Sequence, residues 1–302
     1  MTDLTFFAES LKSDNCEVLL NSPMSRHTSF KVGGCADIVA VPKTTTALHD
    51  VILKAKDSNI DFIVIGNGSN LLVKDCGLNC LVIKTTGMDN DIVVENDTIK
   101  CSAGTSLTRL CLVAYENSLT GLEFAYGIPG TVGGAVFMNA GAYGGEIKDV
   151  LTDVTHITPE GSIITEKAEK LSLSYRHSFY SDNPDFIISG AAFRLQKGNK
   201  EDIKAKMDDL MGRRKDKQPL EYPSAGSTFK RPEGHFAGAL IEQCGLKGFN
   251  IRGAEVSEKH AGFVINKDNA DASAVLELMK HIQETVKIET GVTLEPEVRI
   301  IP

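Results

Sequence analysis

Two glycine-rich, apolar stretches have the composition of ligand-binding loops. The first is Ile65-Gly-Asn-Gly-Ser-Asn-Leu-Leu-Val73, and the second runs from Gly127 to Glu146. Glycine lets the backbone take positive φ and approach a ligand closely, and successive amides in such turns form a concave set of N–H donors that suits a pyrophosphate. In the second stretch Thr131 precedes an apolar run, which predicts a short helix whose N-terminus would favour anions. Tight turns around a buried core are the alternative, but two long stretches with few charges favour a bound dinucleotide.

The glycine spacing excludes two common nucleotide-binding folds. Gly66-x-Gly68-x-x-Leu71 lacks the third glycine of the Rossmann fingerprint, and Gly130-x-x-Gly133-Gly134 has the wrong order for it. The chain contains no Gly-Lys-Ser or Gly-Lys-Thr, so it is not a P-loop hydrolase. The sequence therefore predicts a phosphate-binding loop of another fold.

Three polar residues have surroundings that could support chemistry. Arg176 is flanked by apolar and aromatic residues, Ser227 lies in a turn of small residues, and Glu297 begins an apolar C-terminal segment. Each also has a structural interpretation: the arginine could stack on an aromatic ring, the serine could satisfy backbone groups, and the glutamate could pair with Arg299. The residues alone leave both readings open.

Composition indicates a cytosolic globular protein of two or three domains. The chain has 302 residues and a net charge of −8, which argues against a nucleic-acid partner. Its N-terminus has no signal-peptide pattern, and the apolar stretch 124–145 is broken by a proline and seven glycines, so no membrane insertion is expected. Seven cysteines without a CxxC pair predict reduced, mostly buried thiols, and scattered histidines predict no metal site.

Hydrophobic periodicity predicts an α+β protein. Apolar residues at helical spacing predict helices at the following ranges: 46–58, 107–116, 201–217, 237–244 and 272–290, the last closed by Gly291. Short apolar segments predict strands at these ranges: 62–65, 81–83, 92–94, 98–101, 150–157, 162–165, 186–195, 262–266 and 297–301. A charged amphipathic helix is expected from residue 201, which predicts a domain boundary just before it, and a small N-terminal lobe is expected to end near residue 78. The three expected regions are an N-terminal lobe at 1–78, a second lobe at 79–197, and a C-terminal domain at 198–302.

Five motifs in one order carry a resemblance to a known family. They are Gly66-Asn-Gly-Ser-Asn-Leu-Leu, Gly127-Ile-Pro-Gly-Thr-Val-Gly-Gly, Tyr175-Arg176, Gly226-Ser227-x-Phe229-Lys230-x-Pro232 and Leu294-x-x-Glu297-Val-Arg. Together they resemble the UDP-N-acetylmuramate dehydrogenases, also called UDP-N-acetylenolpyruvoylglucosamine reductases, from about residue 21 to residue 301. The resemblance implies a vanillyl-alcohol-oxidase (PCMH)-type FAD-binding fold, formed by the two N-terminal lobes, with a C-terminal α+β substrate-binding domain.

The same resemblance implies an activity and three catalytic residues. NADPH would deliver a hydride to non-covalently bound FAD, and the hydride would pass to the terminal vinyl carbon of the enolpyruvyl ether of UDP-N-acetylglucosamine, a step of cytoplasmic peptidoglycan precursor synthesis. Arg176 resembles the family arginine that holds the substrate carboxylate and stabilises the enolate. Ser227 resembles the proton donor to the adjacent carbon, and Glu297 the glutamate that shares the charge or orients the donor.

The resemblance also implies binding residues. The expected FAD contacts are Gly66, Asn67, Gly68, Ser69, Asn70, Gly130, Thr131, Gly133, Gly134 and Ala135, with Asn139 nearby. The candidates for the UDP-sugar phosphates are Tyr143, Lys217 and Lys230, for which a surface or structural role is the alternative. No oligomeric state is predicted.

Two features depart from the family pattern, and two other functions stay open. Only 51 positions separate Arg176 from Ser227, which is typical of a shorter subgroup without a tyrosine-bearing lid insertion. Arg252 occupies a position where glycine is expected. The alternatives are another FAD oxidoreductase of this fold, acting on a hydroxy acid or sugar lactone with oxygen, and a non-catalytic nucleotide-sugar or flavin-binding module.

Overall fold

The computed structural model describes residues 3–88 and 92–301, which form two compact units. Unit 1 comprises Met1–Leu20, Ile38–Asn67 and Cys80–Arg213, and unit 2 comprises Asn21–Asp37, Gly68–Asn79 and Arg214–Pro302. Neither unit is continuous in sequence, because two N-terminal segments join the C-terminal part of the chain. The three contiguous regions 1–78, 79–197 and 198–302 remain a prediction about functional lobes.

Unit 1 contains most of one sheet and the whole of a second. Its helices are α1 (Asp3–Leu11), α2 (Thr45–Asp57), α3 (Leu107–Glu116), α4 (Val132–Phe137), α5 (Phe179–Asp182) and most of α6 (Lys200–Lys217). The first sheet has the order β1 (Cys16–Pro23), β2 (Cys35–Pro42), β5 (Leu78–Lys84) and β3 (Phe62–Ile65). The second has the order β12 (Ile163–Lys167), β11 (Leu151–Ile157), β13 (Ile187–Arg194), β7 (Thr98–Ser102) and β6 (Ile92–Glu95). Strands β3 and β5 are parallel, whereas the second sheet is antiparallel.

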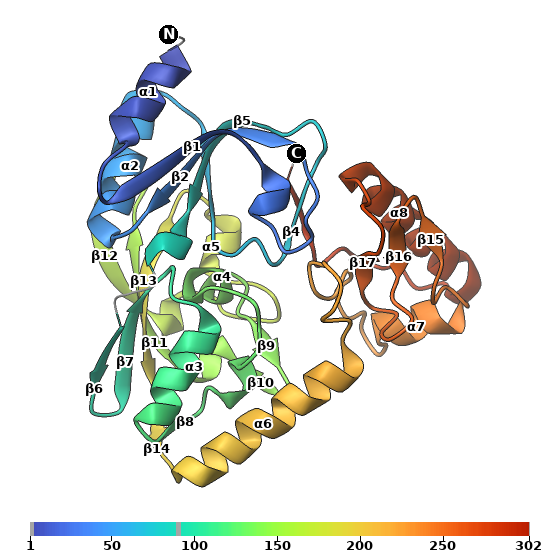
Figure 1. Ribbon diagram of the computed structural model, residues 1–302. Helices are drawn as coiled ribbons and strands as arrows, with labels where there is room; N and C mark the ends of the chain where they lie inside the picture. The colour runs from blue at the N-terminus through green and yellow to red at the C-terminus, as the bar shows by residue number, and fades with distance from the viewer. Residues whose placement is uncertain (1–2, 89–91, 302) are drawn as a thin grey trace. The chain divides into compact units, whose positions relative to one another are not determined.

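Two short strand pairs complete unit 1. One is β9 (Gly141–Ala142) with β10 (Gly145–Glu146), and the other is β8 (Leu119–Thr120) with β14 (Gln196–Lys197). In Figure 1, α4 lies beside the strands of the five-stranded sheet, and its residues contact β13 and β7. The buried side chains of α3, α4 and this sheet form one hydrophobic core. That core fixes both ends of the second glycine-rich stretch.

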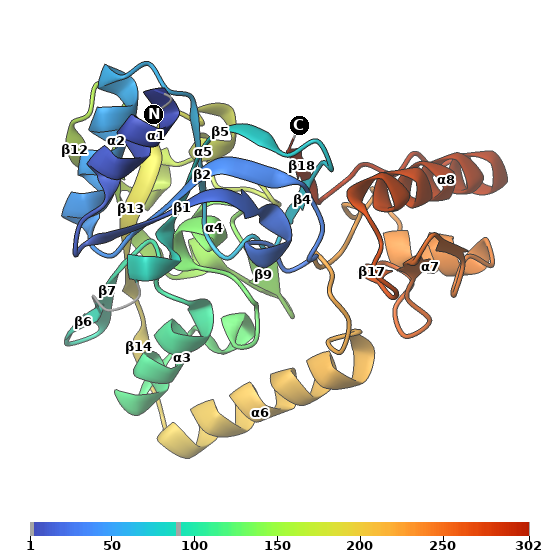
Figure 2. The ribbon, with the colours of Figure 1, turned by 45° about the horizontal axis from the view of Figure 1, so that its top comes forward.

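Unit 2 is smaller and also α+β. It contains α7 (Ala237–Gln243) and α8 (Ala272–Thr290), a sheet of β15 (Asn250–Ile251), β16 (Ala254–Val256) and β17 (Val264–Asn266), and the parallel pair β4 (Leu71–Val73) with β18 (Arg299–Ile301). Helix α8 packs on α7 and on the three-stranded sheet, and Figure 2 shows α8 beside α7 and β17. The parallel pair joins the end of the first glycine-rich stretch to the C-terminal strand.

The predicted helices are confirmed, and their ends have clear physical causes. Helix α3 begins at Leu107 and ends at Glu116 as predicted, because Ser106 accepts a hydrogen bond from the amide of Arg109. Helix α8 also has the predicted bounds: Asp271 caps its first turn, and Gly291 ends it at φ 75°. The helix predicted after Thr131 is α4, which Thr131 caps through Gly134. Among described residues, no helix has the length and apolar character needed to span a membrane.

Some predictions need correction. The segments 262–266 and 297–301 form strands only from Val264 and Arg299 onward, because the residues before them turn and bond elsewhere, for example Gly262 N–H to His260. Sequence patterning did not predict α1, β1 or β2. The expectation of mostly buried cysteines is wrong: Cys16, Cys101 and Cys111 are buried, but Cys35 and Cys76 are exposed, since they lie at a strand start and in a turn.

One buried histidine predicts a dependence of stability on pH. His156, on β11, is 2% exposed; its Nδ1 bonds the Tyr180 hydroxyl at 2.8 Å, and its Nε2 has no partner among the described residues. Burial lowers the pKa of His156 below its ordinary value. The folded state therefore binds fewer protons than the unfolded chain below about pH 6.5, so the free energy of unfolding should fall as the pH drops from there toward the folded pKa.

Urea unfolding at pH 7.5 and pH 5.5 tests this prediction. Replacing His156 with phenylalanine should make the unfolding midpoint less sensitive to acid than in the parent, because a phenylalanine cannot take up a proton. The Tyr180 hydroxyl loses its partner in this variant, which lowers the midpoint equally at both pH values. An acid-induced loss as large in the variant as in the parent would assign the pH dependence to other groups.

Candidate functional site

A cavity of about 290 Å³ lies within unit 1 beside the two glycine-rich stretches. The residues that line it are Asn67, Thr86, Gly104, Ser106, Thr108, Ile128, Pro129, Gly130 and Thr131. Asn67, Gly130 and Thr131 were predicted from the sequence, and the others were not. The missed signal is the small-residue turn Ser102-Ala-Gly-Thr-Ser106 between a predicted strand and a predicted helix, a third glycine-containing loop.

Close backbone packing explains the glycines around this cavity. A Cβ on Gly66 would lie 2.2 Å from Thr131 Oγ1, and one on Gly104 would lie 1.8 Å from the carbonyl oxygen of Thr85. The Asn67 side chain donates to the carbonyl of Pro129 at 2.8 Å. Glycine is needed here because any larger residue would push the neighbouring loops apart.

The first amides of α4 bind protein rather than remaining available to an anion. Val132 N–H donates to Thr105 O, Gly133 N–H to Ala103 O, and Gly134 N–H to the Thr131 hydroxyl. The short helix thus joins the second glycine-rich stretch to the turn before α3. This differs from the expectation that its N-terminus would supply donors to an anion.

Other amides around the cavity do remain available. The backbone N–H groups of Asn67, Gly104 and Thr108 donate no hydrogen bond to any residue within 3–88 and 92–301. Unsatisfied donors on a polar, glycine-rich wall suit a phosphate-bearing ligand. The cavity volume is near the lower end of ligand pockets, about 300–1,000 Å³, so it matches one part of a dinucleotide.

Arg176 lies at the tip of a tight turn in unit 1. Ser174 and His177 pair through two backbone hydrogen bonds of 3.1 and 3.2 Å, which leaves Tyr175 and Arg176 at the tip. Arg176 has φ 53°, its Nη2 donates to the Gly141 carbonyl at 3.1 Å, and its guanidinium lies 5.1 Å from the centre of the Tyr175 ring. The arginine is therefore held by a strained backbone and by a neighbouring strand.

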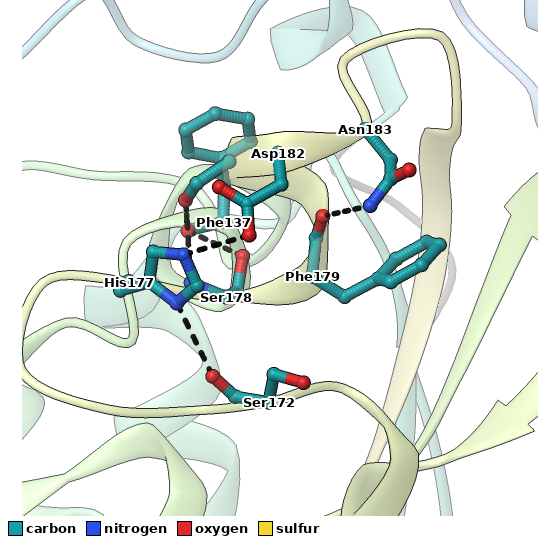
Figure 3. Close-up of polar contacts among 8 residues, drawn as sticks. Phe137, Ser172, His177, Ser178, Phe179, Asp182 and Asn183 are labelled. Atoms are coloured by element: carbon teal, nitrogen blue, oxygen red, sulfur yellow. Dashed lines mark hydrogen bonds and ion pairs between the residues drawn. The ribbon is translucent and has the colours of Figure 1, made fainter.

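Figure 3 shows how the far side of this turn is anchored. His177 Nε2 bonds the Asp182 carboxylate at 3.1 Å, and its Nδ1 bonds the Ser172 carbonyl at 3.3 Å. The hydroxyl of Ser178 donates to the carbonyl of Phe137, the last residue of α4, at 2.7 Å. The arginine turn is thus attached to the end of the same helix whose start lines the cavity.

Asn139 contacts the arginine turn directly, and Tyr143 belongs to a hairpin that Arg176 contacts. Tyr143 and Gly144 form the two-residue loop between β9 and β10, with φ 54° and 88° as a type I′ turn requires. The Tyr143 side chain is 43% exposed, whereas Asn139 is completely buried. The Asn139 amide donates to Ser174 O at 2.8 Å and accepts from Lys148 N–H at 3.0 Å.

Unit 2 brings Ser227 and Glu297 together. Glu297 N–H donates to the carbonyl of Thr228 at 2.9 Å, so residue 297 lies beside the residue after Ser227. Ser227 is partly exposed, follows Gly226 at φ 77°, and its hydroxyl bonds nothing among the residues described. Asn70 donates from its side chain to Glu297 O at 3.1 Å. A serine hydroxyl open to a ligand therefore lies next to a carboxylate residue and the end of the first glycine-rich stretch.

Three further basic residues of unit 2, Lys217, Lys230 and Arg252, lie on exposed surface. Lys217 is exposed near the end of α6, and the Lys230 ammonium pairs with Glu295 at 3.3 Å. Arg252 has φ 45°, the left-handed conformation for which glycine is preferred, and its guanidinium pairs with Glu277 at 2.7 Å. Arg252 therefore has a surface ion pair of its own.

Comparison with known proteins identifies two domains. Residues 36–166 match the family described as "FAD binding domain", and residues 218–301 match "UDP-N-acetylenolpyruvoylglucosamine reductase, C-terminal domain". The first range contains the cavity, and the second contains Ser227 and Glu297. Both domains are those that the sequence resemblance implied.

Curated relatives and a solved structure agree over nearly the whole chain. The chain is 48% identical to the UDP-N-acetylenolpyruvoylglucosamine reductase of Latilactobacillus sakei over 100% of this chain and 98% of the relative. It is 50% identical to that of Clostridium botulinum strain Eklund 17B, covering 93% and 92%. The solved reductase from Thermus caldophilus matches with a TM-score of 0.80 at 34% identity, covering 95% of this chain and 99% of the other. With this identity, coverage and domain order, the chain belongs to the UDP-N-acetylenolpyruvoylglucosamine reductase family.

Proposed function

We propose that this protein is a flavoenzyme that uses NADPH to reduce the enolpyruvyl ether of UDP-N-acetylglucosamine to UDP-N-acetylmuramate. The reaction is a step in peptidoglycan precursor synthesis. The observation that carries the proposal is the cavity of unit 1. Its wall has backbone N–H groups without a partner among the described residues, and the loops beside it have positions where only glycine fits. The 36–166 segment that contains this cavity matches an FAD-binding domain. The two glycine-rich stretches carry the expected FAD contacts, and FAD is held non-covalently.

The residues present fit this cofactor. Asn67, Gly130 and Thr131 line the cavity together with amides that have no protein partner, which is the donor set that phosphate oxygens need. When bound, FAD would supply the hydride chemistry that links NADPH to the enolpyruvyl group. The tasks of the chain's own residues are to hold the substrate and to move one proton.

Arg176 has the chemistry to hold the substrate carboxylate. Adding a hydride to the terminal vinyl carbon of the enolpyruvyl group puts negative charge on the adjacent carbon, and this charge spreads into the carboxylate. A planar, permanently charged guanidinium binds a carboxylate through two parallel hydrogen bonds. A fixed cation stabilises that charge without reorganising.

Ser227 supplies the proton in this proposal. A hydroxyl is a weak acid, but the enolate carbon is basic enough to take its proton when the geometry is held. Glu297 lies beside the serine turn within unit 2 and is proposed to orient the donor or share the charge. Tyr143, Lys217 and Lys230 are proposed to contact the UDP phosphates.

The proposed setting is the cytoplasm. Seven cysteines without a CxxC pair suit reducing conditions. A net charge of −8 gives no excess basic surface for a polyanion, so the proposed partners are small molecules and no nucleic acid.

Anaerobic turnover tests the proposed function. The purified protein should contain FAD, and its flavin absorbance should be lost with NADPH and restored by the enolpyruvyl sugar. Bleaching by a hydroxy acid or sugar lactone, with recovery by oxygen, would instead indicate an oxidase of the same fold. Stoichiometric FAD without turnover would indicate a binding module, and either result would overturn the proposal.

Gly66 offers a prediction for cofactor binding. Changing Gly66 to alanine places a Cβ 2.2 Å from Thr131 Oγ1, so the loop or the threonine must move. Overpacking of this kind costs about 1–3 kcal/mol, and we expect FAD to bind about tenfold more weakly or worse. Gly212→Ala is the matched control, because a Cβ there meets nothing within 4 Å. The measurement is the flavin-to-protein absorbance ratio during titration, and equal FAD affinity in the two variants would contradict the assignment.

A further inference from the structure

Asn139 uses its whole side chain to join two turns of unit 1. Its Nδ2 donates to the Ser174 carbonyl at 2.8 Å and to Glu146 Oε2 at 3.3 Å, and its Oδ1 accepts from Lys148 N–H at 3.0 Å. The residue is 0% exposed. Buried amides that make this many hydrogen bonds fix the segments they connect, because an unmade bond there is costly.

The two segments are the turn that carries Arg176 and the hairpin that carries Tyr143. Ser174 is the residue that opens the arginine turn, and Lys148 and Glu146 follow the Tyr143 loop. The guanidinium of Arg176 itself bonds the hairpin at Gly141 O. Asn139 therefore fixes the arginine turn relative to the hairpin, and with it the separation between the Arg176 guanidinium and Gly141 O.

The other anchors of the arginine turn hold its opposite side. His177 bonds Ser172 and Asp182, and Ser178 bonds Phe137 (Figure 3). On the Ser174 side, Asn139 donates to the carbonyl of the residue that opens the turn. Loss of this donor would release one arm of the turn while the other arm stays attached.

We propose that Asn139 is a positioning residue that places Arg176 for the substrate carboxylate, and that it does not contact the flavin. The inference rests on the proposed function of Arg176. It explains why an asparagine lies within the second glycine-rich stretch at φ 40°: asparagine tolerates the left-handed region, and its amide offers a donor and an acceptor on opposite sides.

The variant Asn139→Asp removes the donor and keeps the acceptor. At neutral pH the new carboxylate faces the Ser174 carbonyl and the Glu146 carboxylate, which repel it. Burial and Glu146 raise the pKa of such a carboxyl, so acid adds a proton whose O–H again donates to Ser174 O. The other charged or titratable groups described on these segments are Lys148 and Asp149 on the hairpin side, Arg176 and His177 on the turn, and Asp182, which bonds His177.

Stopped-flow measurement of both half-reactions gives the first readout. In the Asn139→Asp holoenzyme we expect flavin content and the NADPH half-reaction within about twofold of the parent. The sugar half-reaction should be on the order of 10²-fold slower at pH 8, the loss typical of a misplaced oxyanion donor. The rate of the sugar half-reaction in this variant, divided by the parent rate at the same pH, should be about tenfold or more higher at pH 5.5 than at pH 8. Equal slowing of both half-reactions, or no slowing, would overturn the proposal.

Two further variants serve as controls. Asn183→Asp makes the same chemical change at the residue that follows α5, whose side-chain amide donates to Phe179 O at 2.9 Å (Figure 3); its half-reactions should match the parent. Asn139→Gly keeps the left-handed backbone, and is the variant to use if the aspartate does not fold. It should slow the sugar half-reaction without recovery in acid. Recovery in the glycine variant would contradict the donor role.

Hydrogen exchange separates this proposal from the proposed function. In Asn139→Asp, peptides covering 173–178 should exchange faster, because the Ser174 and His177 amides bond each other's carbonyls. Peptides covering 145–150 should stay protected, since the acceptor for Lys148 N–H remains. If Arg176 variants kept full activity, the proposed function of Arg176 would be refuted, but the faster exchange at 173–178 in Asn139→Asp would still be expected. Unchanged exchange at 173–178 would refute the positioning role alone.

Discussion

Replacing Ser227 with alanine should slow transfer to the enolpyruvyl sugar by about 10²-fold or more and leave reduction by NADPH near the parent rate. A positioned proton donor contributes about 10²–10⁴-fold, and only the second half-reaction needs the proton. The hydroxyl follows a left-handed glycine and has no hydrogen-bond partner among the residues that the structure describes. Its removal therefore breaks no hydrogen bond to the described residues.

The two half-reactions of Ser227→Ala are measured separately under anaerobic conditions. Ser224→Ala, in the same turn, is the matched control, because its side-chain hydroxyl makes no hydrogen bond to any residue that the structure describes, and its backbone carbonyl accepts from the hydroxyl of Ser29 at 2.7 Å. The control should behave like the parent in both steps. If both half-reactions of Ser227→Ala slowed alike, the serine would have a structural role and the assignment would be wrong.

Changing Arg176 to lysine should give the second large loss. Lysine keeps the charge but loses the two-pronged geometry that matches a carboxylate and the Nη2 bond to Gly141 O. We expect the sugar-dependent rate to fall on the order of 10²-fold, as for other losses of charge stabilisation, with little change in flavin content. Steady-state kcat and KM for the sugar, together with the flavin ratio, measure this.

Arg194→Lys is the control for the Arg176 variant. Arg194 is an exposed arginine on β13 of the same unit, so its substitution should change neither turnover nor flavin content. Loss of flavin in Arg176→Lys would indicate a damaged fold around the arginine turn, and an unchanged sugar-dependent rate would remove Arg176 from the mechanism.

Much of the fold was predictable because burial and local capping act together. Helices α3 and α8 have the predicted bounds, since each has an apolar stripe and a Ser or Asp cap at its start. Helix α1 and strand β1 were not predicted: in β1 only Cys16 and Ser22 are buried, so its sequence carries no clear alternation. Long-range pairing, rather than local preference, forms such strands.

The sequence motifs of the site were predictable, but the residues that surround these motifs in the fold were less so. Three of the predicted residues line the cavity, while Gly104, Ser106 and Thr108 were missed because one glycine in a short turn has no distinctive spacing. The contact between the serine turn and residue 297 depends on a pairing across nearly seventy residues, which no local pattern reveals. The hydrogen bonds of Asn139 likewise become visible only when the two turns are placed together.

The roles of Arg176, Ser227 and Glu297 came from the family resemblance rather than from their chemistry alone. An arginine beside a tyrosine commonly stacks, and Arg176 does lie over the Tyr175 ring. In Arg176 that contact is combined with a left-handed backbone and with a hydrogen bond from the guanidinium to Gly141 O. These features describe a side chain held in place, which is the property that charge stabilisation requires.

A double-mixing stopped-flow experiment tests the central claim most directly. The anaerobic protein is mixed first with one equivalent of NADPH and then with the enolpyruvyl ether of UDP-N-acetylglucosamine, while the flavin absorbance is followed. We predict loss of absorbance in the first mixing and full recovery in the second, with one equivalent of UDP-N-acetylmuramate formed. Absorbance that stays lost after the sugar is added, and returns only with oxygen, would contradict the account.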